Sequence, residues 1–110
     1  ANRESRAFKL LKLGDTLLRL EESGLVAELE KFYPDCVVLF GSAAKGEDTE
    51  KSDIDIFVQA KEAEIHPGKL EKALKRKLNM MFEPDMGKVS KELKNSLANG
   101  VVLAGYLKVA

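Results

Sequence analysis

Cysteine is nearly absent from this chain, which contains Cys36 alone. One cysteine excludes an internal disulfide and any zinc cluster built from cysteines, and we expect a reducing, cytoplasmic setting. No apolar run approaches the roughly 20 residues that a membrane-spanning helix needs, so no membrane partner is expected. Neither sign of charge dominates, because Lys plus Arg and Asp plus Glu both total 18. A net charge of zero provides no global field that attracts nucleic acid, so any electrostatic attraction must be local.

The length of 110 residues suits one domain with one hydrophobic core, and the apolar fraction of 45% is ordinary for a globular protein. The chain begins at Ala1 rather than at a methionine, so we expect either a trimmed chain or a domain excised from a longer protein. Within the single domain over residues 1–110, residues 1–33 are expected to form an N-terminal helical segment.

Hydrophobic periodicity and turn residues predict a series of short helices and strands. The first helix, residues 1–22, carries an apolar stripe that is broken near Gly14, where Asp15 can cap a second piece. The other predicted helices span residues 25–32, 69–77 and 90–99, and the predicted strands span residues 36–40, 53–59 and 78–82. This order predicts an α+β (α/β) domain with helices packed against a small mixed β-sheet.

Residues 37–60 read VVLFGSAAKGEDTEKSDIDIFVQA, with a Gly-Ser turn after one predicted strand and an Asp-Ile-Asp triplet on the next. Side chains alternate along a strand, so Asp53 and Asp55 point to the same face, about 6.5–7 Å apart. Two such carboxylates favour a hard cation such as Mg²⁺, which binds through one or two carboxylates together with substrate phosphates. The backbone N–H groups and the hydroxyl of Gly41-Ser42 suit a phosphate.

Three common sites do not fit this segment. A Walker A loop ends in Gly-Lys-Ser/Thr, whereas Gly46 is followed by Glu47. A dinucleotide-binding fingerprint requires Gly-x-Gly, which Ala43 interrupts. An EF-hand loop would need a ligand where Phe57 stands. The segment therefore indicates a metal and nucleotide site of another kind.

The combination of Leu39-Phe40-Gly41-Ser42, Gly46 and Ser52-Asp53-Ile54-Asp55-Ile56 resembles the DNA polymerase β nucleotidyltransferase superfamily. The residues of this motif are most similar to those of the minimal nucleotidyltransferases of archaea and bacteria. The motif covers residues 37–60, and the later segments through residue 103 are similar in layout. The resemblance implies transfer of a nucleoside monophosphate from a Mg²⁺-bound nucleoside triphosphate, expected to be ATP, to an acceptor hydroxyl.

The resemblance also implies a role for each motif residue. Gly41 lets the backbone approach the nucleotide phosphates, Ser42 bonds a terminal phosphate and Lys45 neutralises phosphate charge. Asp53 and Asp55 are the implied catalytic residues and hold two Mg²⁺ ions. Such ions stabilise the attacking and leaving oxygens of an in-line displacement.

Active members of the superfamily place a third acid on the neighbouring strand, and here Asn79 takes its expected place. An amide carbonyl can ligate a metal weakly, but it brings no charge and is a poor base. Glu83 shares the same face by the two-residue period, but it lies at the end of the strand. Asn79 is therefore the expected third metal ligand, and its lack of charge weakens the expectation of catalysis more than that of the fold.

A second interpretation is a nucleotide-binding module with weak or no catalysis. By the same resemblance, such domains act as antitoxins for a helical toxin, or follow a winged-helix DNA-binding domain in a regulator. A glycosyltransferase also uses Asp-x-Asp with a divalent metal, but its folds are usually much larger than 110 residues. The exposed edge of a small sheet can pair with a partner or with a second copy, so an oligomer is also compatible with the sequence.

Basic residues recur on two predicted helices. They are Arg3, Arg6, Lys9 and Lys12 on the first, and Lys69, Lys72, Lys75, Arg76 and Lys77 on the helix over residues 69–77. Such clusters can bind nucleic acid or an acidic partner. Because acidic residues are interspersed, we predict a solvated helix face instead. Cys36 lies in a predicted buried strand, where we expect it to serve core packing.

Overall fold

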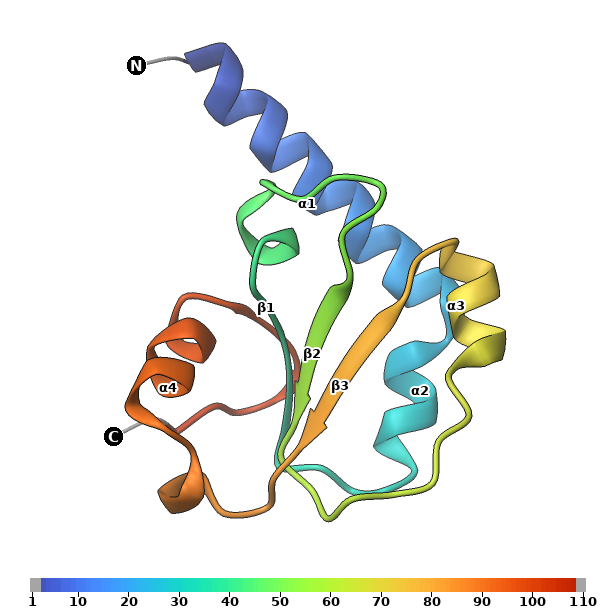
Figure 1. Cartoon of the computed structure of the whole chain (residues 1–110), viewed down its shortest axis with the longest axis vertical. Coiled ribbons are helices and arrows are strands. Elements are labelled where there is room, and N and C mark those ends of the chain that lie inside the picture. The colour runs from blue at the N-terminus through green and yellow to red at the C-terminus, as the bar shows by residue number, and fades with distance from the viewer. Residues whose placement is uncertain (1–2, 109–110) are drawn as a thin grey trace.

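A four-stranded mixed sheet with the strand order β3-β2-β1-β4 forms the centre of the computed structural model, which describes residues 3–108 (Figure 1). The strands are β1 (Cys36–Phe40), β2 (Ile54–Val58), β3 (Leu78–Phe82) and β4 (Val101–Gly105). β1 pairs antiparallel with β2 and β4, whereas β2 pairs parallel with β3. The predicted α+β domain with a small mixed sheet is therefore confirmed.

Helices cover both faces of the sheet (Figure 1). They are α1 (Arg3–Ser23), α2 (Leu25–Glu30), α3 (Gly68–Leu74) and α4 (Lys91–Ala98). The first three pack on one face, and α4 packs on the other. Within residues 3–108, no helix combines the length and the apolar composition that crossing a membrane requires.

The two central strands place their side chains as their sequences predict. All five residues of β1 are buried, because this strand has a neighbour on each side and helices on each face. Along β2, Ile54, Ile56 and Val58 face the α1–α3 layer, whereas Phe57 faces α4. Burying each such side chain stabilises the fold by about 1.5–3 kcal/mol. Asp55 shares the face of Phe57 because side chains alternate along a strand.

The predicted break at Gly14 is wrong, because α1 runs without interruption from Arg3 to Ser23. Leu13, Leu17 and Leu20 pack into the core, whereas Gly14 is exposed. A glycine inside an exposed helix costs about 1 kcal/mol relative to alanine, which the burial of the leucines outweighs. Asp15 does not cap a second helix, and its carboxylate instead accepts a hydrogen bond from Arg19 Nε at 2.9 Å.

Two other predicted helices end earlier than the sequence indicated. α2 ends at Glu30 instead of residue 32, and α3 ends at Leu74 instead of residue 77. At the end of α3, Lys75 adopts a left-handed conformation with a φ of 58°. This turn directs the next residues toward β3 and releases Arg76 from the helix.

The C-terminal part contains one confirmed helix and one strand that the sequence did not predict. Ser90 caps α4, because its hydroxyl accepts a hydrogen bond from the Leu93 N–H at 3.1 Å. The chain then returns as β4 beside β1. The sequence did not predict β4, because residues 101–105 end in Ala104 and Gly105, which are poor strand formers.

Candidate functional site

Asp55 lies between two neighbours in the sheet. Its partner in β1 is Phe40, and its partner in β3 is Asn79. Asn79 Nδ2 donates a hydrogen bond to Asp55 Oδ1 at 3.0 Å. The structure therefore places Asn79 beside Asp55, on the neighbouring strand where the family resemblance implied a third ligand.

The turn after β1 brings its backbone against the same carboxylate. Gly41 has a φ of 76°, in the left-handed region that favours glycine. A Cβ atom at Gly41 would overlap Asp55 Oδ2 and would lie 3.3 Å from Asp55 Cγ. The missing side chain thus provides the space that the carboxylate occupies at the end of β1.

Ser42 follows directly and begins a short 3₁₀ helix, η1 (Ala43–Lys45). The Ser42 carbonyl accepts hydrogen bonds from the Lys45 N–H at 3.1 Å and from the Glu47 N–H at 3.0 Å. These bonds close a single helical turn after Ser42. It carries Lys45 close to Gly41, although the two residues are four positions apart.

A cavity of about 150 Å³ opens beside Gly41 and Lys45. Its other lining residues, Asn95, Ser96 and Asn99, come from α4 and the position that follows it. No motif in the sequence indicates these three residues. Their signal is the polar face of α4 opposite the buried Leu97, which by itself resembles any solvated helix face.

Asp53 lies immediately before β2, and its side chain is exposed. Among the side chains of residues 5–108, its carboxylate has no hydrogen-bond or ion-pair partner. The carboxylate thus has no protein partner that a cation would need to displace.

These residues fit a hard cation that also takes phosphate oxygens. Asp53 offers an unpaired carboxylate, and Asp55 offers one that has its Oδ2 beside Gly41. Carboxylate oxygens are the ligands that Mg²⁺ uses together with substrate phosphates. The part of the chain from residue 3 to residue 108 holds no group of three or more His, Cys, Asp or Glu side chains arranged for a metal. The site therefore supplies two carboxylates and an amide.

Glu83 does not join this group. Its N–H donates to the Val58 carbonyl at 3.1 Å, at the opposite end of β2 from Asp53. Its carboxylate accepts a hydrogen bond from the Asp85 N–H at 3.0 Å. Glu83 therefore shapes the turn after β3 and lies away from Asp55.

The prediction of a solvated basic face is confirmed for Lys9, whose side chain is 44% exposed. It is wrong for Lys12 and Arg76, which point toward the buried Asp48. Lys9 Nζ lies 2.9 Å from Glu47 Oε2, and both Lys12 and Arg76 pair with Asp48. The hydrogen bond and charge of Lys9 hold the pKa of the Glu47 carboxyl below its ordinary value of 4.5. These basic residues fix the loop between η1 and β2, which the sequence could not show because their partners lie 24 or more positions away.

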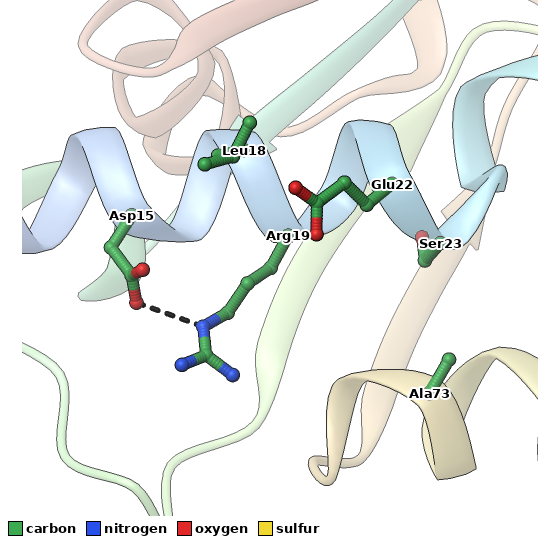
Figure 2. A pocket seen from close by; sticks show the side chains of 6 residues that line it. All are labelled: Asp15, Leu18, Arg19, Glu22, Ser23 and Ala73. Atoms are coloured by element: carbon green, nitrogen blue, oxygen red, sulfur yellow. Dashed lines mark hydrogen bonds and ion pairs between the residues drawn. The ribbon is translucent and has the colours of Figure 1, made fainter.

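A separate cavity of about 450 Å³ lies between α1 and α3 (Figure 2). Its lining residues are Asp15, Leu18, Arg19, Glu22, Ser23 and Ala73. Figure 2 shows the ion pair between Asp15 and Arg19 along α1, and both side chains are more than half exposed. This cavity includes none of the predicted site residues, so nothing connects it with the site at Asp55.

Comparison with protein families matches residues 25–106 to the model described as polymerase beta, nucleotidyltransferase. The matched segment contains all four strands and every predicted site residue, whereas α1 precedes it. No curated protein matches the chain.

Proposed function

The chain belongs to the polymerase beta nucleotidyltransferase family, and we propose that it transfers a nucleoside monophosphate from Mg²⁺-bound ATP to an acceptor hydroxyl. One observation carries the proposal, namely the close approach of the Gly41 turn to Asp55. It sets a backbone suited to phosphate beside a carboxylate suited to a cation.

In this proposal, Asp53 and Asp55 hold Mg²⁺, and the amide of Asn79 orients Asp55 and offers its oxygen as a weak third ligand. The bound cation would neutralise phosphate charge and stabilise the oxygens of the displacement. Gly41 and Ser42 bind the phosphates through backbone N–H groups and the hydroxyl. Lys45 adds a positive charge next to the turn, where it shares a cavity with Gly41.

The proposed reaction is an in-line displacement at the α-phosphorus of ATP. The acceptor oxygen forms the new bond to phosphorus, and the bond to the departing pyrophosphate breaks. Such transfers depend mainly on positioning and charge neutralisation, so few protein groups suffice. Asn79 cannot accept a proton as a carboxylate does, so the proton of the acceptor hydroxyl would pass to an aspartate or to water.

The test is incubation with ATP labelled at the α-phosphate, Mg²⁺ and candidate acceptors of three classes: proteins, RNA and small molecules. We expect label on an acceptor with the natural protein and none with Asp53→Asn. Asp35→Asn is the matched control, because Asp35 is an exposed aspartate in the turn before β1. If the natural protein labels no acceptor of any class, the proposal of transfer is wrong.

A second candidate function is that of a nucleotide-binding regulatory module, either an antitoxin for a helical partner or part of a DNA-binding regulator. The candidate site supplies only two carboxylates from the residues that the structure describes, and this favours the module. By the family resemblance, Asn79 stands where a third acid would assist catalysis. Calorimetry with Mg²⁺-ATP distinguishes the two candidates. Binding without transfer supports the module, and transfer of label supports the enzyme.

A further inference from the structure

Asp48 is a buried carboxylate in the loop that leads to Asp53. Its side chain is only 3% exposed. Oδ2 accepts a hydrogen bond from Arg76 Nη1 at 2.6 Å, whereas Oδ1 has no hydrogen-bond partner and lies 3.7 Å from Lys12 Nζ. Because removing a carboxylate from water is costly even when it is paired, such an arrangement is weak evidence for stability and calls for another explanation.

Arg76 makes a second set of contacts next to the candidate site. Its Nε and Nη2 donate to the Ser52 carbonyl at 3.0 and 2.9 Å. The guanidinium group is planar and holds its donors in a rigid fork, so the two bonds fix the direction of this carbonyl. The Ser52 carbonyl shares a planar peptide group with the Asp53 nitrogen, and its direction therefore fixes the backbone that enters Asp53.

The backbone that leaves Asp53 is held by the neighbour of Arg76. The Ile54 N–H donates to the Lys77 carbonyl at 2.9 Å. Arg76 and Lys77 thus hold the peptide groups on the two sides of Asp53, while the Asp53 carboxylate itself has no partner among the side chains of residues 5–108. A fixed backbone with an unpaired, exposed carboxylate is suited to a ligand that arrives from solvent.

We propose that Arg76, held by Asp48, is a positioning residue that presents the Asp53 carboxylate to the metal–nucleotide complex. This inference rests on the proposed function, because it takes Asp53 as a metal ligand. Lys12 extends the arrangement to α1, since its Nζ contacts both Asp48 Oδ1 and the Asp48 carbonyl oxygen. α1 lies outside the matched family segment and yet contributes to the support of Asp53.

The experiment measures Mn²⁺ binding by electron paramagnetic resonance with a non-hydrolysable ATP analogue. Arg76→Met removes both sets of contacts, and Arg76→Lys keeps the charge opposite Asp48 but loses the fork. Lys72→Met, on the exposed side of α3, is the matched control. Groups that orient metal ligands typically change metal affinity by about 10–100-fold. We expect a loss of this size in Arg76→Met, a smaller loss in Arg76→Lys and none in Lys72→Met.

Thermal unfolding of the metal-free proteins separates positioning from a general loss of structure. Binding is measured at least 20 °C (roughly the width of an unfolding transition) below the lowest midpoint, so that every variant is folded. Affinity equal to the control in both Arg76 variants overturns the proposal, whatever their midpoints. If Arg76→Met does not fold, Arg76→Lys alone decides. If the natural protein binds no Mn²⁺–nucleotide, the proposed function fails first, and the positioning role fails with it.

Discussion

The Gly41 backbone and the Asp55 side chain occupy adjoining space, so that a methyl group on Gly41 would overlap Asp55 Oδ2. The two residues are 14 positions apart in the sequence and meet because Phe40 and Asp55 are partners in the antiparallel pair of β1 and β2. The Gly41 turn and Asp55 can therefore be tested as one unit.

Gly41→Ala is expected to lower the free energy of unfolding by about 1–3 kcal/mol, because it combines a left-handed φ with displacement of the Asp55 carboxylate. It should also abolish the rise in melting temperature that we expect Mg²⁺-ATP to give the natural protein. Thermal unfolding with and without Mg²⁺-ATP measures both effects.

Gly24→Ala is the matched control for that variant. Gly24 also has a positive φ, of 81°, but a Cβ atom there meets nothing within 4 Å. This control should show the backbone cost alone and keep the response to Mg²⁺-ATP. Equal responses to ligand in the two variants would contradict the role assigned to the contact of Gly41 with Asp55.

Asn79→Asp is expected to lower stability without metal by about 1–2 kcal/mol. The change replaces the hydrogen bond to Asp55 Oδ1 with two like charges on neighbouring strands. With saturating Mg²⁺, Asn79→Asp should become more stable than the natural protein. Ligand at 100 times its dissociation constant stabilises a protein by about 2.7 kcal/mol. Thermal unfolding across a Mg²⁺ titration measures the crossover.

Ser90→Asp is the control for this reversal, because Ser90 is exposed, lies outside the cavity beside Gly41, and can be replaced as the N-cap of α4 by aspartate. Its stability should change little with Mg²⁺. If Mg²⁺ stabilises Asn79→Asp no more than it stabilises the control, the side chain at position 79 does not reach the cation.

Gly14→Ala is expected to raise the free energy of unfolding by about 0.5–1 kcal/mol, since α1 is continuous and nothing lies within 4 Å of the new Cβ atom. Urea unfolding followed by circular dichroism at 222 nm (roughly the helix minimum) measures it. Gly46→Ala gives the contrast, because its Cβ atom would overlap the Lys9 carbonyl oxygen and should destabilise. A loss of stability in Gly14→Ala would indicate that α1 bends at this residue.

The Cys36 thiol should make stability fall at alkaline pH. Burial, assisted by the negative charge of Asp35, raises the pKa of Cys36 above its ordinary value of 9.0. The unfolded thiol therefore loses its proton at a lower pH than the folded one, so this stabilisation is complete below pH 9 and declines above it. Urea unfolding between pH 7 and 10.5 should show a decline of up to about 1.4 kcal/mol per pH unit that Cys36→Ala lacks. If the free energy of unfolding falls with pH equally in the natural protein and in Cys36→Ala, the raised pKa of Cys36 is wrong.

The sequence predicted the elements whose signal is local. The apolar run of β1 and the alternation of β2 fixed both strands and the faces of Asp55 and Phe57. The break at Gly14 was predicted wrongly because local propensity costs about 1 kcal/mol, less than the packing of the leucines that continue the helix. The sequence did not predict β4, because two of its residues have low strand propensity and only its pairing with β1 compensates for them.

The loop before Asp53 illustrates what sequence reading could not supply. Asp48 and Arg76 are ordinary charged residues in the sequence, where both would be expected at the surface. They become a buried pair only because the end of α3 returns beside the start of β2. No local pattern encodes this meeting, since it depends on the parallel pairing of β2 with β3.

By itself, the sequence determined the motif residues Gly41, Ser42, Asp53 and Asp55, because turn chemistry and the two-residue period of a strand act between near neighbours. It also predicted the family, to which the chain belongs. Only the tertiary structure showed that Asn79, which the sequence favoured over Glu83, donates a hydrogen bond to Asp55, and that Arg76 holds the backbone at Asp53. Those contacts follow from strand register and helix packing, which join residues distant in sequence through the burial of a shared core.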